Sequence, residues 1–292
     1  MGARAHEPDR LQRVPNARRE MAARPILVAA TRQHVGKTTL SLALMSGLRK
    51  RFGDRVGFIK PVGQEHVRPA GEAFSVDKDV ELMRMYFGLD HVGFEDMSPV
   101  LIPRSYTKRF IDGEVTLAAQ EAGLRASFAR VRAASDAVLL EGTGHVGVGA
   151  IVGLSNARVA ALLGADVVLV ANGGLGKAFD ELELNRALCE ASGVRVRGVV
   201  LNKVLPDKVA MVRDYFGRTL AQRDAWRAVP LLGVVPDLPL LAKPSLGALA
   251  HAAGGELVAG ARLRALHYAS EDIEVGGNPV ACRAPRRVRA SE

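Results

Sequence analysis

The sequence predicts a doubly wound α/β fold with a mostly parallel sheet. From residue 25 onward, short apolar runs alternate with amphipathic stretches of helix length, which is typical of βαβ units. Several runs are unbroken Val, Leu and Ile, as expected of strands covered on both faces. A Gly-Lys-Thr string lies between the first apolar run and a helical pattern, where open parallel sheets bind ligands.

The expected elements follow in order along the chain. Strands are predicted at residues 26–30, 56–59, 137–140, 167–171, 198–201 and 231–235. Helices are predicted at 40–50, from an N-cap at Asp112 to about residue 134, at 180–192 and at 207–227. We expect residues 1–24 to form a disordered basic extension, 25–240 the main domain, 241–275 a small appended segment, and 276–292 a disordered basic tail.

Composition and charge exclude several classes of protein. The 292 residues are 48% apolar and 24% charged, as in ordinary globular chains. The two cysteines, Cys189 and Cys282, lack metal-ligand spacing and favour a reducing, cytoplasmic setting. Of the net charge of +9, +3 falls in residues 1–24 and +3 in 279–292. We therefore expect no nucleic-acid partner, and no apolar run is long enough to predict a membrane span.

The strongest local signal is Ala-Thr-Arg-Gln-His-Val-Gly-Lys-Thr-Thr at residues 30–39. A phosphate-binding loop needs backbone N–H groups at a helix N-terminus, a lysine for the β and γ oxygens, and a hydroxyl for magnesium. Gly36, Lys37 and Thr38 supply these groups, although Ala30 or Thr31 stands where the first glycine is usual. The expected nucleotide contacts are Thr31, Arg32, Gln33, His34, Val35, Gly36, Lys37, Thr38 and Thr39.

Two further predicted strands end in charged residues at the same edge of the sheet. Leu-Leu-Glu-Gly-Thr-Gly places Glu141 where a magnesium-side carboxylate is expected, with a plain loop residue as the alternative. Phe-Ile-Lys-Pro-Val-Gly-Gln places Lys60 there too. We expect Lys37 and Lys60 to be catalytic by stabilising a transferred phosphoryl group, although Lys60 as a solvated strand-end lysine stays open.

Two other segments allow a functional and a plain interpretation. Residues 104–109, Arg-Ser-Tyr-Thr-Lys-Arg, gather three bases that form either a lid over an anionic ligand or a solvated loop. His145 follows the Glu-Gly-Thr-Gly turn, as a proton-transfer group or as polar surface.

Together, ATRQHVGKTT, FIKPVGQ, SVDKDVELM, LLEGTG and VVLNKV resemble the dethiobiotin-synthetase-like P-loop NTPase family in order and rough spacing, over residues 25–240. The resemblance implies ATP and Mg²⁺ as cofactors. It implies that Lys37, Thr38 and Lys60 contact phosphate, magnesium and substrate. It implies that Asp79 and Glu141 are the acids on the metal side, with Asp77 as the alternative to Asp79. Asn202 would contact the base, and Pro236 is a further expected nucleotide contact. The Asp of the guanine-reading pattern is missing after Asn202, which favours adenine.

The KPVGQ string also resembles the N-terminal domain of long phosphate acetyltransferases. Residues 244–278 resemble the opening of the DRTGG-type domain that follows it there, although the DRTGG string is absent. No residues remain for an acetyl-transfer domain, so phosphate acetyltransferase activity is not expected.

The resemblance implies a magnesium-dependent ATP-binding protein, either a nucleotide-dependent regulatory domain or a stand-alone ATPase. The alternative is an ATP-dependent ligase that activates a carboxylate or carbamate, a dethiobiotin synthase. Arg32 and His34 replace acidic loop residues of that family, and Gln64 replaces a substrate-binding Ser, which weakens the ligase interpretation. Expected partners are the nucleotide, a small anionic substrate or a protein, and a second copy of the chain in a homodimer. Arg32 lies where partition-type ATPases carry a signature lysine that acts across a dimer, so it would contact the phosphates of the nucleotide bound to the second copy.

Overall fold

The computed structural model describes residues 24–252, 254–256, 258–259, 261–268, 273–275 and 280–282. The chain divides into two compact units, with the boundary between Val235 and Pro236, whereas the sequence predicts it after residue 240. The predicted basic extension and basic tail lie outside the described residues, apart from Arg24 and residues 280–282.

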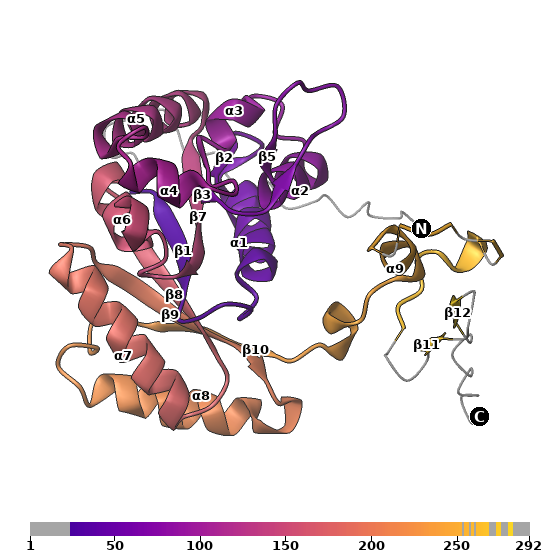
Figure 1. Ribbon diagram of the computed structural model, residues 1–292. Coiled ribbons are helices and arrows are strands. Elements are labelled where there is room, and N and C mark those ends of the chain that lie inside the picture. Colours follow the sequence, from indigo (N-terminus) through magenta and orange to yellow (C-terminus); the bar gives the residue numbers. More distant parts are fainter. Residues whose placement is uncertain are drawn as a thin grey trace, which may run out of the picture. The chain divides into compact units, whose positions relative to one another are not determined.

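A six-stranded sheet organises the first unit (Figure 1), with the strand order β10-β9-β8-β1-β7-β2. The strands are β1 (Ile26–Ala30), β2 (Val56–Ile59), β7 (Ala137–His145), β8 (Asp166–Asn172), β9 (Val196–Val204) and β10 (Leu231–Pro236). The pairs β1–β7, β1–β8, β2–β7 and β8–β9 are all parallel. The doubly wound, mostly parallel sheet and its six predicted strands are therefore confirmed, and β7, β8 and β9 extend beyond the predicted ranges.

The middle of the sheet is buried on both faces. Residues 27–30 of β1 and 137–142 of β7 are buried without interruption. Successive side chains of a strand point to opposite faces, so helices must cover both. Helix α1 (Lys37–Phe52) packs on β1, β2 and β7, α5 (Leu117–Ala134) on β2 and β7, and α7 (Gly176–Ala191) on β8. Right-handed crossovers place α5 on the face opposite α1, and Figure 1 shows this arrangement.

The helix predicted from Asp112 begins later than predicted, and a separate short helix precedes it. Helix α4 (Tyr106–Ile111) ends at Asp112, and Gly113 then takes φ +80°. Helix α5 begins after Thr116, whose hydroxyl accepts the backbone N–H of Ala119 at 3.2 Å. Asp112 as an N-cap is wrong because the left-handed glycine that follows it interrupts the helical backbone.

Other helices and short strands complete the first unit. The helix predicted at 207–227 begins as a 3-10 turn, η3 (Pro206–Lys208), and continues as α8 (Val209–Ala221). It therefore ends earlier than predicted. Two small pairs, β3 (Val62–Gly63) with β6 (Val100–Leu101) and β4 (His66–Val67) with β5 (Val76–Asp77), follow β2. The remaining helices are α2 (Lys78–Phe87), α3 (Phe94–Met97), η2 (Ala150–Val152) and α6 (Asn156–Leu163).

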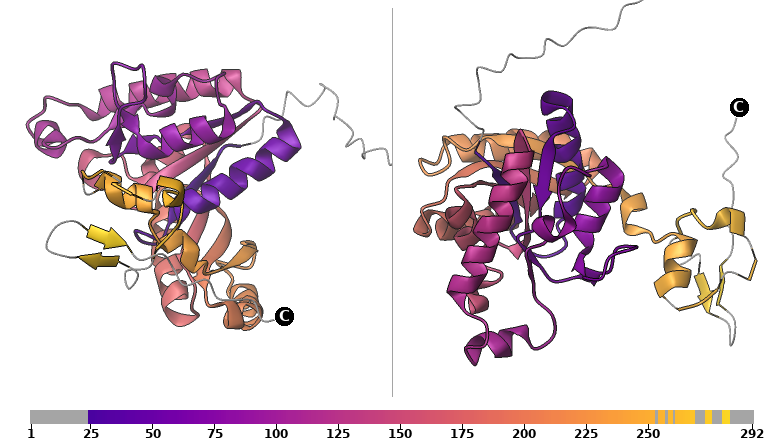
Figure 2. Two further views of the ribbon diagram at one scale, coloured as in Figure 1. Left: turned by 90° about the vertical axis from the view of Figure 1, so that its right-hand side faces the viewer. Right: turned by 90° about the horizontal axis from the view of Figure 1, so that it is seen from above.

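The second unit contains η4 (Pro239–Ala242), α9 (Leu246–Ala252) and η5 (Ala261–Leu263). Strands β11 (Ile273–Val275) and β12 (Val280–Cys282) pair antiparallel, as the yellow arrows in Figure 2 show. In the part of the chain that the structure describes, no helix combines the length and the apolar character that crossing a membrane requires.

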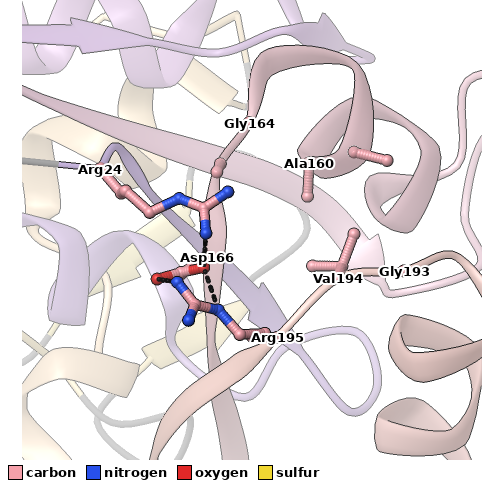
Figure 3. Close-up of a pocket in the computed structure, with 9 residues that line it drawn as sticks. Arg24, Ala160, Gly164, Asp166, Gly193, Val194 and Arg195 are labelled. Carbon is pink, nitrogen blue, oxygen red and sulfur yellow. Dashed lines mark hydrogen bonds and ion pairs between the residues drawn. The ribbon is translucent and has the colours of Figure 1, made fainter.

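A polar cavity of about 270 Å³ lies at the amino ends of β1, β8 and β9 (Figure 3). Asp166, the first residue of β8, is buried there and pairs with Arg24 at 3.6 Å, Arg195 at 3.2 Å and Arg197 at 3.5 Å. Both oxygens of this carboxylate are therefore engaged by neighbouring arginines. The cavity lies at the edge of the sheet opposite the Gly-Lys-Thr loop.

Candidate functional site

The Gly-Lys-Thr loop connects the carboxyl end of β1 to the N-terminus of α1. Gly36 is the N-cap of α1 and takes φ +90°. A Cβ atom at Gly36 would collide with the side-chain amide of Asn202, so only glycine fits this turn. Lys37 and Thr38 are the first residues of α1, whose free N–H groups favour an anion at this end.

Strand β9 holds the loop through two successive side chains. The Nδ2 of Asn202 donates to the carbonyl of Val35 at 2.7 Å, and the Nζ of Lys203 donates to the carbonyl of His34 at 2.9 Å. His34 and Lys203 have positive φ, 60° and 56°, a conformation that is costly outside glycine and concentrates at functional sites. Base contact by Asn202 stays a prediction. The sequence contains Lys203 in its Asn-Lys string but gives no sign of its reach to the loop.

Four polar side chains from separate segments meet beside Lys37. The hydroxyl of Thr38 lies 3.0 Å from Glu141 Oε1 and 3.3 Å from Asp79 Oδ1. The Nζ of Lys60 lies 2.5 Å from Asp79 Oδ2 and 3.1 Å from Glu141 Oε1. Lys60 directly follows β2, Glu141 lies within β7, and helix α2 begins here, so residues far apart in sequence form one cluster.

Burial and charge act in opposite directions on these groups. Burial raises the pKa of Glu141, against the opposing effect of the Lys60 ammonium. Burial also acts on Asp79, but Lys60 outweighs it and lowers the pKa of that carboxyl. Burial would lower the pKa of Lys60, yet the two carboxylates raise it above its ordinary value. Burial, and then the charge of Lys60, lower the pKa of Lys37.

The structure separates Asp77 from Asp79, which the sequence leaves as alternatives. The Asp77 carboxylate caps α2 by accepting the backbone N–H of Asp79 at 3.0 Å, and it also accepts that of Gln64 at 3.0 Å. Its oxygens are thus occupied by backbone donors. Asp79 is the residue whose carboxylate faces Thr38 and Lys60.

Helix α7 contacts the start of the loop, which the sequence does not indicate. The Thr31 hydroxyl donates to Glu181 Oε2 at 2.8 Å, and Arg32 Nε lies 3.7 Å from Glu181 Oε1. Asn185, one turn further along α7, donates to the carbonyl of Thr31 at 3.2 Å. Arg32 is therefore paired within its own chain.

The remaining predicted nucleotide contacts differ in exposure to solvent. Gln33 and Thr39 are exposed and Val35 is fully buried. Pro236 is exposed and is the last residue of β10. In the described part of the chain, no three His, Cys, Asp or Glu side chains gather as a metal site, so the cluster offers two carboxylates and one hydroxyl.

The predicted lid segment and His145 have local partners. Tyr106 donates from its hydroxyl to Gln120 at 2.9 Å, and Arg109 pairs with Glu114 at 2.9 Å. His145 is exposed, and its Nδ1 accepts the backbone N–H of Gly147 at 3.1 Å. These contacts define the geometry of both segments, and their functional roles stay predictions.

The comparisons with known proteins agree with this geometry. Residues 24–245 match the family model of an AAA domain. The chain is similar to the ATP-dependent dethiobiotin synthetase BioD of Aromatoleum aromaticum, with 30% identity across 72% of this chain and 89% of that protein. For the enzyme of that name in Corynebacterium efficiens the values are 32%, 72% and 88%.

Two further similarities extend the comparison. A phosphate acetyltransferase of Pseudomonas putida is 28% identical over 79% of this chain, which spans 32% of that protein. Among solved structures, a plasmid partition protein from Borrelia burgdorferi is similar with 14% identity and a TM-score of 0.46, over 74% of this chain and 90% of that one. The family model and the two synthetases together show that the chain belongs to the dethiobiotin-synthetase-like family of P-loop NTPases.

Proposed function

We propose that this protein binds ATP with Mg²⁺ at the Gly-Lys-Thr loop and acts as an ATPase, alone or as a nucleotide-dependent regulatory domain. The convergence of Thr38, Lys60, Asp79 and Glu141, with neighbouring polar atoms 2.5–3.3 Å apart, carries the proposal. Burying charges costs desolvation free energy that pairing often does not return. Such a cluster at the end of a strand therefore indicates chemistry rather than stability.

The donor set of the cluster suits Mg²⁺. Thr38, Asp79 and Glu141 would hold the ion, since Mg²⁺ prefers oxygen ligands and commonly takes one or two carboxylates together with substrate phosphates. Glu141 Oε2 is buried and has no hydrogen-bond partner among the described residues, which leaves one carboxylate oxygen available. When bound, Mg²⁺ neutralises charge on the phosphate oxygens.

The two lysines would act on the phosphates directly. Lys37 at the N-terminus of α1 would contact the β and γ oxygens. Lys60, held between Asp79 and Glu141, would stabilise the negative charge of a transferred phosphoryl group by electrostatic attraction. Adenine is the proposed base because the Asn202-Lys203-Val204-Leu205 string lacks the acidic residue of the guanine-reading pattern.

An ATP-dependent ligase that activates a carboxylate or carbamate is the second candidate. Its support is the 30% and 32% identity to dethiobiotin synthetases over most of their length. Gln64 and Arg32 weigh against a diamino acid as the substrate, because the family pattern has hydroxyl and acidic groups there. Arg32 also pairs with Glu181 at 3.7 Å, so its charge is already engaged within the chain.

We propose a cytoplasmic homodimer as the assembled form, with a small anionic substrate or a protein as further partner. Arg32 supports a dimer, because it is exposed and stands where the resemblance to partition-type ATPases implies a residue that acts across a dimer. Sedimentation equilibrium with and without Mg·ATP tests it. A monomer under both conditions contradicts the dimer and leaves ATP binding as a separate question.

The function is tested by ATP binding and by ADP release from the purified full chain, with and without diaminopelargonate and bicarbonate. Lys37→Ala is expected to weaken ATP binding about 10- to 150-fold, since hydrogen bonds to charged groups contribute about 1.5–3 kcal/mol. Lys50→Ala, an exposed lysine of the same helix, serves as the matched control. Slow turnover that the substrate pair leaves unchanged supports the ATPase or regulatory role. Stimulation by that pair, lost in Lys37→Ala, supports the ligase, and absence of ATP binding contradicts both.

A further inference from the structure

Strand β7 is irregular directly after Glu141. In its pairing with β1, Val28 lies opposite Glu141, but Ala30 lies opposite His145. More residues of β7 than of β1 therefore fill this stretch, which is a β-bulge. A bulge removes ladder partners from backbone groups, and buried backbone groups need replacements.

Asn156, the first residue of α6, supplies partners within the bulge. Its Oδ1 accepts the backbone N–H of Thr143 at 3.1 Å. Its Nδ2 donates to the carbonyls of Thr143 at 2.8 Å and His145 at 2.7 Å. The side chain is buried, so these bonds fix the bulge locally.

Asn185 on α7 supplies the next partner but also reaches a second segment. Its Oδ1 accepts the N–H of Val146 at 3.0 Å, while its Nδ2 donates to the carbonyl of Thr31 at 3.2 Å and to that of Glu181 at 2.8 Å. Because a backbone N–H only donates, Oδ1 must face Val146 and Nδ2 must face Thr31. One planar, buried amide thus joins the segment after β7 to the first residue of the phosphate-binding loop.

We propose that Asn185 is a positioning residue that couples the phosphate-binding loop to the bulge loop, residues 143–149. The inference rests on the proposed nucleotide binding and adds a route by which that binding changes the bulge loop. A displacement of Thr31 on phosphate binding acts on Nδ2, and the planar amide passes it to Oδ1 and Val146. Glu181 supports the same point of contact through the Thr31 hydroxyl. The bulge loop begins shortly after Glu141, the proposed metal-side acid.

Coupling is measured by hydrogen exchange of the Val146–Val148 amides in the full chain, with and without Mg²⁺ and a non-hydrolysable ATP analogue. Calorimetry measures analogue binding in the same samples. In the wild type, the analogue is expected to slow this exchange at least about fivefold, the lower end of usual coupling between sites. Asn185→Asp keeps the acceptor for Val146 and loses the donor to Thr31, so it should bind the analogue without slowing exchange.

Asn156→Asp is the matched control, because Asn156 bonds the bulge but not the phosphate-binding loop. It should exchange faster in both states while keeping the wild-type ratio. Asn185→Ser, which adds no charge, replaces Asn185→Asp if a buried carboxylate prevents folding. Wild-type binding without protection, or an unchanged ratio in the folded Asn185 variant, overturns the coupling alone. Wild-type protein that binds no analogue overturns the proposed function and this inference with it.

Discussion

Lys60→Met removes the positive charge that Asp79 and Glu141 share. The Nζ atom lies 2.5 Å from one carboxylate and 3.1 Å from the other, and the side chain of Glu141 is 0% exposed. Methionine fills a similar volume but leaves both carboxylates without this partner. Breaking a buried ion pair from one side costs about 3–5 kcal/mol, because the remaining charge is uncompensated. We expect the free energy of unfolding at pH 8, without nucleotide, to fall by that amount.

The difference in the free energy of unfolding between Lys60→Met and the wild type should become smaller as the pH falls. Burial raises the pKa of Glu141, and removing Lys60 raises it further, since this ammonium opposes the shift. Because the folded-state pKa of Glu141 lies above its unfolded value, the contribution of this carboxyl to the free energy of unfolding is complete below the unfolded pKa, about 4.3. That contribution is lost as the pH rises through the folded pKa. Lys60→Met should therefore lie closer to the wild type at pH 5 than at pH 8.

Urea unfolding followed by circular dichroism at both pH values measures this effect. Lys50→Met is the matched control, because Lys50 is exposed on α1, and it should remain within about 0.5 kcal/mol of the wild type. A Lys60→Met protein as stable as the wild type at pH 8, with an unchanged urea dependence, would refute a shared buried charge cluster.

Three further outcomes follow from the structure. Gly36→Ala should lower ATP affinity at least about tenfold, since φ is +90° and a Cβ collides with a neighbouring amide; Gly47→Ala, whose Cβ meets no described atom within 4 Å, should retain wild-type binding by calorimetry. Trp226→Ala should cost about 3–5 kcal/mol in urea unfolding, because the indole is 1% exposed; a loss below about 1 kcal/mol would contradict its place in the core. Burial raises the pKa of Cys189 to about 12, so in a Cys282→Ser background it should react with iodoacetamide at pH 8 only after unfolding, and rapid native labelling would contradict that burial.

Much of the sheet can be predicted from sequence because its strands are covered on both faces. Unbroken Val, Leu and Ile runs identify them without help from periodicity. Helix limits are less predictable, since the pattern from Asp112 onward continues through Gly113, where the backbone turns left-handed. Two-residue strands such as β3 and β4 carry no repeat for a pattern to reveal.

The candidate site is predictable where function follows directly from a strand end. The predicted strands stop just before Lys60 and Glu141; β7 in fact continues to His145, but the parallel pairing of Ile59 with Leu140 still brings the two residues together. The choice between Asp77 and Asp79 depends on which carboxylate caps α2, a tertiary detail. Asn185 gives no signal at all, because a buried asparagine within an amphipathic helix looks like an ordinary polar position.

The arginine-ringed Asp166 has a practical consequence for immobilising this protein. The chain enters β1 through Arg24, beside that carboxylate, and the five residues of β1 then span roughly 17 Å at about 3.3 Å each before the phosphate-binding loop begins. An affinity tag or fluorophore fused directly ahead of Arg24 would thus be anchored at the far edge of the sheet. Sensor surfaces built on that attachment should leave nucleotide access open, whereas probes inserted into the loops after β2 or β7 would obstruct it.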